Sequence, residues 1–273
     1  PAHSARAWPW PWTRRLRVSP RSLAPPASPP VSTPTAIVQA FNANADGYDR
    51  HLEPIITIKH ALHALLRSHF AALPAVAHVL VVGAGTGAEA RYLAPLFPGW
   101  RFTLVDPSEA MLGVARRHAD AEGFADRCTF HAGFVSSVPA DGFDAATSVL
   151  VSHFIPVAGD RQAYFADIAR RLSPGGLLFN ADLCAERTRG DFAAVMDLWL
   201  TLAATPDERR EQFRAAFGRD FAVHGPAELE AMVAGAGFSP PVPVFQAALV
   251  RAWITTMAEE SKRRVPLVAK TGV

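Results

Sequence analysis

The chain has 273 residues, of which 49% are hydrophobic and 19% charged, and its formal net charge is +2. This composition is typical of a soluble globular protein and supplies enough apolar residues for one sizeable α/β domain. The small net charge argues against a protein that coats nucleic acid, and the lack of a long apolar run argues against one that spans a membrane.

The first 33 residues differ in composition from the rest of the chain. Residues 1–33 contain eight prolines, five arginines and no acidic residue. Such a segment buries too little apolar surface to offset the entropy of ordering it, so we expect it to be disordered. Its composition leaves open a transit peptide, a misplaced start or a fragment boundary. We expect residues 259–273 to form a flexible basic tail, which leaves 34–258 as the folded domain.

The expected helices and strands alternate through the middle of the chain. Apolar residues at helical spacing predict two helices at about 35–41 and 54–70, separated by a polar break at 42–49. Alternating strands and helices of ordinary length indicate right-handed βαβ units and a parallel sheet. The strands of this region are predicted at 79–82, 101–105, 127–131, 143–148 and 176–181, and its helices at 86–96, 108–121 and 160–171.

The alternation ends after Asp182. Residues 189–221 have the pattern of two consecutive helices, which predicts a lid insertion within about 187–222. A further helix is expected at 226–235. The apolar runs 242–247 and 248–257 are too close together for a crossover helix, so they should form an antiparallel pair at the sheet edge.

Cysteine and histidine spacing does not predict a metal site. Cys128 and Cys184 fall in or beside predicted strands, and we interpret them as reduced thiols of a cytoplasmic protein. His60 and His63 lie one helical turn apart, but no cysteine or acidic residue follows at a spacing suited to a third zinc ligand.

Three glycines at alternate positions, Gly83, Gly85 and Gly87, follow the first buried strand. Glycine allows positive φ and a close approach of the backbone to a ligand, and a helix beginning near Thr86 would present free N–H groups to it. Asp106 ends the next predicted strand, about 20 residues further on, where a carboxylate can accept from both ribose hydroxyls. The pattern favours a nucleoside-containing cofactor and leaves open a methyl donor or a nicotinamide.

This loop and its acidic partner resemble motif I and the second motif of class I S-adenosylmethionine-dependent methyltransferases. The segments 104–112, 143–149 and 172–178 resemble further motifs of that family, in the expected order. The closing antiparallel pair is similar to the family's sheet edge. The resemblance covers about residues 35–257 and implies a doubly wound, Rossmann-like, mostly parallel seven-stranded sheet, an antiparallel edge hairpin, and S-adenosylmethionine as cofactor.

The resemblance also implies roles for individual residues. The glycine loop would receive the methionine portion, Asp106 the ribose, and Met111 would pack on adenine, with Val149 and Leu150 near the sulfonium. Phe134 departs from the family, whose members usually have aspartate there, and so removes an acceptor for the adenine amino group. The expected cofactor contacts are Gly83, Ala84, Gly85, Gly87, Asp106, Pro107, Met111, Gly133, Phe134, Val149, Leu150 and Tyr48.

The residues at the end of the fourth strand limit the classes of methyl acceptor that the sequence favours. Residues 148–150 are Ser-Val-Leu, not the Asn/Asp-Pro-Pro-Tyr of enzymes that methylate amides and exocyclic amines. Neither a Pro-Cys nucleophile nor a clustered pair of acids is present. We therefore expect a small, partly apolar acceptor. His153 is the candidate general base, and its alternative interpretation is a half-buried loop histidine.

Two other functions stay open. An RNA-modifying enzyme of similar fold should carry Lys and Arg interleaved with aromatic residues near the strand ends, and the folded region has no such run. A non-catalytic module that binds S-adenosylmethionine would keep the same loop. We expect a small-molecule partner, with nucleic acid not favoured, no membrane partner, and a monomer or homodimer.

A closer resemblance concerns the carboxy-S-adenosylmethionine synthases of tRNA modification. The Tyr48 segment, the lid length and the segments 236–238 and 244–246 are similar to that branch. Its members have an arginine before Ala-Gly-Phe that holds the extra carboxylate, and here Met232 stands at that place. A buried carboxylate without a charge partner is strongly disfavoured, so we expect plain S-adenosylmethionine as donor.

Overall fold

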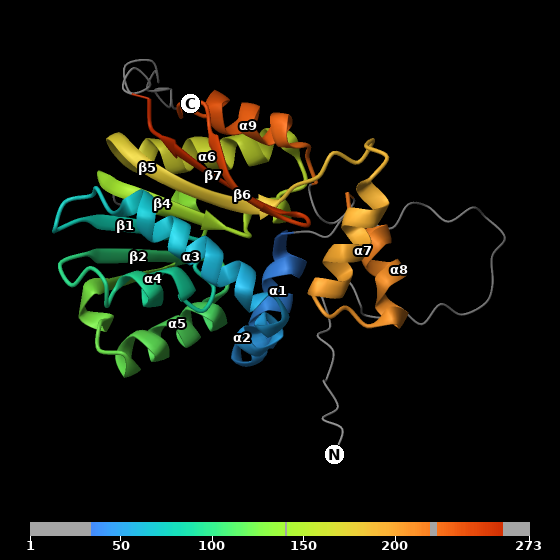
Figure 1. Ribbon diagram of the computed structural model, residues 1–273. Coiled ribbons are helices and arrows are strands. Elements are labelled where there is room, and N and C mark those ends of the chain that lie inside the picture. The colour runs from blue at the N-terminus through green and yellow to red at the C-terminus, as the bar shows by residue number, and fades with distance from the viewer. Residues whose placement is uncertain (1–33, 140, 219–222, 259–273) are drawn as a thin grey trace, which may run out of the picture.

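The computed structural model describes residues 34–139, 141–218 and 223–258. Their central feature is one seven-stranded sheet with the order β3-β2-β1-β4-β5-β7-β6 (Figure 1). The first five strands run parallel, and β7 is antiparallel to both β5 and β6. The strands are β1 (His78–Val82), β2 (Arg101–Asp106), β3 (Cys128–Ala132), β4 (Phe143–Val149), β5 (Leu172–Leu183), β6 (Val242–Ala247) and β7 (Val250–Thr256).

Helices flank both sides of the sheet, as expected for a doubly wound α/β fold (Figure 1). They are α1 (Pro34–Asn44), α2 (Tyr48–His51), α3 (Ile56–Phe70), α4 (Ala88–Leu93), α5 (Glu109–Ala121), α6 (Ala158–Arg171), α7 (Phe192–Leu202), α8 (Asp207–Ala216) and α9 (Pro226–Gly235). The predicted fold class is confirmed, including the antiparallel edge hairpin and a two-helix insertion, α7 and α8, after β5. The expectations for residues 1–33, 219–222 and 259–273 concern residues outside the described ranges.

The first strand shows why the sheet is covered on both faces. Successive side chains of a strand point to opposite faces, and Val79 to Val82 are all apolar and at most 4% exposed. Val79 and Val81 join the core beneath α3, α4 and α5, whereas Leu80 and Val82 join the core beneath α6 and α9. An uninterrupted apolar run therefore becomes a strand that packs against a helical layer on each side.

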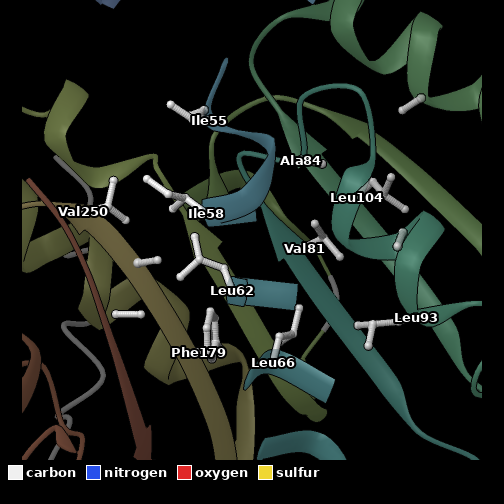
Figure 2. Close-up of a cluster of buried hydrophobic side chains, with 14 of the residues drawn as sticks. Ile55, Ile58, Leu62, Leu66, Val81, Ala84, Leu93, Leu104, Phe179 and Val250 are labelled. Atoms are coloured by element: carbon white, nitrogen blue, oxygen red, sulfur yellow. The ribbon is translucent and has the colours of Figure 1, made fainter. Parts of the chain in front are cut away.

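Helix α3 contributes the longest apolar face of the first layer. Its buried residues recur at intervals of three or four positions, so they lie along one stripe that packs onto the sheet. Figure 2 shows this packing, with side chains of α3 pointing toward side chains of β1, β2 and β5: Ile58, Leu62 and Leu66 from the helix, and Val81, Leu104 and Phe179 from the strands. This packing fixes the orientation of α3 about its own axis, and so the direction in which its other side chains point.

Two predicted boundaries near the N-terminal half were wrong. The polar break expected at 42–49 is helical, since α1 extends to Asn44, a 3₁₀ helix covers Ala45–Gly47 and α2 begins at Tyr48. Tertiary contacts stabilise this segment on α5: the Ser108 hydroxyl donates to Asn42 at 2.7 Å, and Arg117 donates to Asp46 at 2.6 Å. Spacing of apolar residues along the chain does not report such polar contacts.

The helix expected at 86–96 is shorter and begins later, as α4 (Ala88–Leu93). Gly87 precedes it with a φ of +83°, and a Cβ there would lie 3.2 Å from the Ala115 Cβ. A left-handed residue packed closely against α5 cannot be part of a right-handed helix. The helix therefore starts only after the third glycine.

Within the described residues, no helix is both long and apolar enough to cross a membrane. The same ranges contain no group of three or more His, Cys, Asp or Glu arranged to hold a metal ion. Cys128 and Cys184 are both free thiols, and burial raises the pKa of each, to about 11 and about 12.

Candidate functional site

The loop after β1 requires its first glycine. Gly83 has a φ of +64°, and a Cβ at this position would lie 2.4 Å from a γ-carbon of Val151. Real side chains do not tolerate such a contact, so the chain passes Val151 only because Gly83 has no side chain. The next residue, Ala84, donates its backbone N–H to Val105 at 3.0 Å, which fixes the loop between β1 and β2.

Asp106 stands at the carboxyl end of β2 and holds this loop in place. One carboxylate oxygen accepts the backbone N–H of Gly85 at 2.9 Å, and the other accepts the N–H of Ser108 at 2.8 Å. Its side chain is nearly buried, with 9% of the residue exposed. Burial raises the pKa of Asp106 to about 6, although the two N–H donors oppose the shift. Two lone-pair positions remain for other donors, as ribose recognition requires.

A cavity of about 40 Å³ opens beside the glycine loop. Six residues predicted to contact a cofactor line it: Tyr48, Gly83, Ala84, Gly85, Val149 and Leu150. The structure therefore brings together the start of the loop, the end of β4 and the N-terminal helical segment at the carboxyl edge of the sheet.

The remaining predicted cofactor residues lie on the other side of the loop, around Asp106. The Gly133 N–H donates to the Asp106 backbone carbonyl at 3.0 Å, and the Phe134 side chain is 56% exposed. Pro107 directly follows Asp106 and is half-buried. Met111 is 1% exposed and packs with Ala45, under the N-terminal segment. Neither these four residues nor Asp106 and Gly87 line the cavity.

Helix α2 lies against the glycine loop. The Thr86 hydroxyl donates to the Asp49 carboxylate at 2.7 Å. The neighbouring Tyr48 ring lies 4.0 Å from where a Gly85 Cβ would stand, and it lines the cavity. Burial, followed by the charges of Glu89, Asp106 and Asp49, raises the pKa of the Tyr48 phenol far above its usual value, so it stays neutral.

Three ionisable side chains in the cavity were not predicted: Lys59 and His63 from α3, and Glu89 from α4. His63 and Glu89 are each 8% exposed, and the His63 Nε2 lies 3.6 Å from a Glu89 carboxylate oxygen. Burial alone raises the pKa of Glu89, but His63 and Lys59 outweigh it and bring the pKa below its usual value. Lys59 and His63 are spaced by four residues, a helical repeat that hinted at a shared direction.

His153, the candidate base, belongs to a fully buried polar network after β4. Its Nδ1 is hydrogen-bonded to Asp182 at the end of β5, and its ring is 3% exposed. The Ser152 hydroxyl donates to the same carboxylate, and Arg161 donates to it at 3.0 Å and to Ser152 at 2.8 Å. Burial raises the pKa of Asp182, but Arg161 and His153 reverse the effect and hold it well below its usual range.

An ionised Asp182 determines the tautomer of His153. A carboxylate only accepts hydrogen bonds, so the proton on the His153 ring is at Nδ1, and in the neutral ring Nε2 carries the basic lone pair. Leu150 precedes this network with a φ of +58° and donates its N–H to Ala181 at 2.7 Å. Left-handed backbone in a leucine is strained, and such strain is concentrated at functional sites. Sequence reasoning missed Asp182, which is 29 residues from His153 in the chain, and Arg161, which belongs to no recognised motif.

The two-helix insertion carries a second cavity of about 150 Å³. Its walls are mostly apolar, with two arginines at the side: Phe192, Ala193, Met196, Phe217, Arg187 and Arg214. Arg214 is paired with Asp197 on α7 at 2.5 Å. Trp199 is 4% exposed and packs in the core beneath the insertion.

The central part of the chain is similar to known methyltransferases. A family profile described as a methyltransferase domain matches residues 80–178, which run from β1 into β5. The release factor glutamine methyltransferase of Chlorobaculum tepidum is 35% identical over 45% of this chain and 42% of its own length. The ubiquinone biosynthesis O-methyltransferase of Methylocella silvestris is 31% identical over 52% of this chain and 54% of its own length.

Solved structures share the fold beyond the matched segment. An O-methyltransferase family protein from Burkholderia thailandensis aligns with a TM-score of 0.59 and 16% identity, over 82% of this chain and 60% of that chain. Most of this chain therefore shares the fold of that protein. The chain spans only about a third to a half of the length of the curated relatives it matches.

Proposed function

We propose that this chain, an S-adenosylmethionine-dependent methyltransferase by its domain and its class I fold, methylates a small, partly apolar molecule. The observation that carries the proposal is the Asp106 carboxylate. It is nearly buried at the end of β2, bonded to the Gly85 N–H, and directly beside a cavity lined by the same glycine loop. A ribose at Asp106 would direct the methionine chain of the cofactor over the glycine loop.

Bound S-adenosylmethionine supplies an electrophilic methyl group on a sulfonium, so the protein has chiefly to position the acceptor in line with it. Val149 and Leu150 lie at the end of β4 on the cavity wall and can hold the reacting end of the cofactor. The Tyr48 ring, covering Gly85, would shield that end from water.

We assign proton removal to His153. S-adenosylmethionine bound at this site would supply the methyl group, and the His153 Nε2 would accept the proton that the acceptor hydroxyl loses. The hydrogen bond from Nδ1 to the ionised Asp182 would stabilise the imidazolium that results. A protein in which His153→Gln retained both full activity and an unchanged pH–rate profile would exclude this role.

The charge distribution of the insertion supports a small molecule over RNA. Two of its exposed arginines are paired with acidic residues on the same segment, Arg189 with Asp191 and Arg214 with Asp197. Paired charges produce little of the extended positive field that binding to a phosphate backbone needs. The apolar walls of the second cavity favour an acceptor with an apolar body. We also propose that the protein is a monomer or homodimer and has no nucleic-acid partner.

Plain S-adenosylmethionine remains the proposed donor. Met232 lies on α9 and packs against the core beneath α6 and α9, and neither it nor Arg251 lines the cavity beside the glycine loop. Competition between S-adenosylmethionine and its carboxylated form for the purified protein tests this assignment. Tighter binding of the carboxylated form would move the chain into the carboxy-S-adenosylmethionine synthase branch.

The experiment that tests catalysis is transfer of labelled methyl from S-adenosylmethionine. We expect label in one or more members of a panel of small hydroxylated apolar molecules, and none in bulk tRNA. Label in tRNA alone would favour the RNA-modifying alternative. Tight binding of the donor without transfer to any acceptor, in the panel or in a cell extract, would favour a non-catalytic module.

A further inference from the structure

The cavity of about 150 Å³ in the two-helix insertion is lined by both aromatic rings and guanidinium groups. Phe192 from α7 and Phe217, which follows α8, have ring centroids 5.9 Å apart. Met196 adds a buried thioether, a polarisable group that adapts to the shape of an apolar ligand. An apolar cavity of about 150 Å³ can hold one benzene ring. The insertion therefore has room for a single ring or a branched chain of similar size.

Two arginines line this cavity, and they differ in their partners. Arg214 donates to the Asp197 carboxylate at 2.5 Å. Arg187 forms no ion pair with any residue in the described part of the chain. The carboxylate next to it, Glu186, accepts instead from the Thr188 hydroxyl at 2.8 Å. Within the described ranges, the Arg187 guanidinium thus contributes a positive charge to the cavity wall that no carboxylate neutralises.

Gly218 gives the Arg187 guanidinium its place at the cavity. A Cβ at position 218 would lie 2.2 Å from an Nη of Arg187 and 2.7 Å from its Cζ, so a side chain there would displace the guanidinium. Arg187 precedes α7 and Gly218 follows α8, so this contact joins the two ends of the insertion. The guanidinium is exposed, yet the fold of the insertion places it beside the aromatic wall.

The insertion begins at the same edge of the sheet as the glycine loop. Strands β1, β4 and β5 are parallel, so their carboxyl ends lie at one edge. The glycine loop follows β1, His153 follows β4 and the insertion follows β5, as Figure 1 shows for α7 and α8. Met196 and Phe217 also pack in the same core cluster as Leu183, the last residue of β5. An acceptor that reaches His153 can therefore extend toward the insertion.

We propose that the insertion cavity binds the acid end of the methyl acceptor, with its ring or branched chain against Phe192 and Met196 and its carboxylate at Arg187. This inference rests on the proposed function and narrows it, because the acceptor is then an apolar carboxylic acid that also carries a hydroxyl group. A planar guanidinium binds a carboxylate through two parallel hydrogen bonds. A neutral molecule of the same shape would fill the cavity and leave the charge of Arg187 uncompensated.

Fluorine NMR on the whole chain tests the site without any methyl transfer. The probes are 4-fluorobenzoate and 4-fluorobenzamide, which differ in charge and have nearly the same shape. The wild type should bind the acid more tightly than the amide. Arg187→Gln should weaken binding of the acid about 5- to 10-fold, because solvent reduces the strength of a charged hydrogen bond at an exposed arginine. The same variant should change binding of the amide by less than about twofold.

Ala193→Leu tests the apolar part of the site. Ala193 is exposed and lines the cavity, so the larger side chain should occupy the space without disturbing the core and abolish binding of both probes. Ala194→Leu places the same side chain at the next exposed position of α7, which does not line the cavity. Arg189→Gln removes the charge of an exposed arginine that also lies outside it. Both control variants should bind the probes like the wild type.

Methyl transfer then connects the site with the reaction. The acceptors offered with labelled S-adenosylmethionine are 4-hydroxyphenylacetate, 4-hydroxycinnamate and 3-hydroxydecanoate, each beside its neutral amide. The wild type should prefer the acids. Arg187→Gln should raise KM for the acids about 5- to 10-fold and leave kcat nearly unchanged, because Arg187 contributes to binding and not to the chemical step. His153→Gln should instead lower kcat.

The outcomes separate this inference from the proposed function. If the acid and the amide bind the wild type equally, or if neither Arg187→Gln nor Ala193→Leu changes binding of the acid, the inference is wrong. If the acids bind in the cavity but the amides are methylated as readily, the inference is wrong and the proposed function stands. If the acids bind there and no acceptor of any kind is methylated, the proposed function fails and the acceptor assignment fails with it.

Discussion

The backbone N–H of Gly85 donates to the Asp106 carboxylate at 2.9 Å, which joins the glycine loop to the end of the second strand. This hydrogen bond connects two segments that are separated in sequence, the glycine loop after β1 and the carboxylate at the end of β2. Changes in Asp106 should consequently alter ligand binding on both sides of Gly85, and changes in the loop should alter the position of Asp106.

The first prediction concerns the first glycine of the loop. Gly83→Ala should lower the free energy of unfolding by about 2–4 kcal/mol, because a Cβ would meet Val151 at 2.4 Å and the φ of +64° is unfavourable for alanine. Urea denaturation measures the change. Gly113→Ala, where a Cβ has ample space in α5, is the control and should not destabilise.

A double variant separates the two causes. Adding Val151→Ala to Gly83→Ala removes the γ-carbons that the new Cβ would meet, so part of the lost stability should return relative to Val151→Ala alone. No recovery at all would mean that backbone strain alone requires glycine there.

The second prediction is a pH dependence of cofactor binding. Burial raises the pKa of Asp106 to about 6, and only the ionised carboxylate can accept from both ribose hydroxyls. As pH falls through 6 the carboxylate becomes protonated, so affinity for S-adenosylhomocysteine should fall about tenfold between pH 7 and pH 5. Calorimetry at several pH values measures it.

Asp106→Asn is the control for that dependence. Asparagine cannot titrate, so this variant should bind more weakly at pH 7 and lose most of the change between pH 7 and pH 5. A variant that retained the full pH dependence would assign the titration to another group in the site.

The third prediction concerns the buried network around Asp182. Asp182→Asn should lower the free energy of unfolding at pH 7 by about 3–5 kcal/mol, because Arg161 would be left as a buried charge without its carboxylate. Thermal and urea unfolding measure this. Asp167→Asn on α6, whose arginine partners Arg170 and Arg171 are closer to solvent, should have a much smaller effect.

The sign of the pH effect follows from the pKa of Asp182. Its folded-state pKa is well below that of an unfolded aspartate, so its stabilisation is present above about pH 4 and is lost as pH falls below that value. Asp182→Asn should therefore flatten the acid side of the stability profile. An unchanged acid limb would show that other carboxylates dominate acid unfolding.

Local patterns of residue type were enough to predict the sheet, the glycine loop and Asp106. Val79 to Val82 are apolar without interruption, which indicates a strand buried on both faces, and three closely spaced glycines have few structural uses besides a tight approach to a ligand. The family resemblance added Tyr48, Val149 and Leu150, which do line the cavity.

The charged wall of the cavity and the His153 network could not be predicted in the same way. Glu89 and Lys59 become neighbours only because α3 packs beside α4, and Asp182 reaches His153 only because β5 pairs with β4. These contacts depend on the tertiary arrangement of elements that are far apart in sequence. Burial then changes their pKa values, which spacing along the chain does not report.

The most direct test of the central claim is the affinity of S-adenosylhomocysteine for the wild type and for Asp106→Ala, measured by calorimetry at pH 7.5. Loss of the charged acceptor should weaken binding by about 1.5–3 kcal/mol, or roughly 10- to 100-fold, with the unfolding transition of the variant still cooperative. Equal affinities for the wild type and a folded Asp106→Ala would contradict the assignment of this site to an adenosyl cofactor.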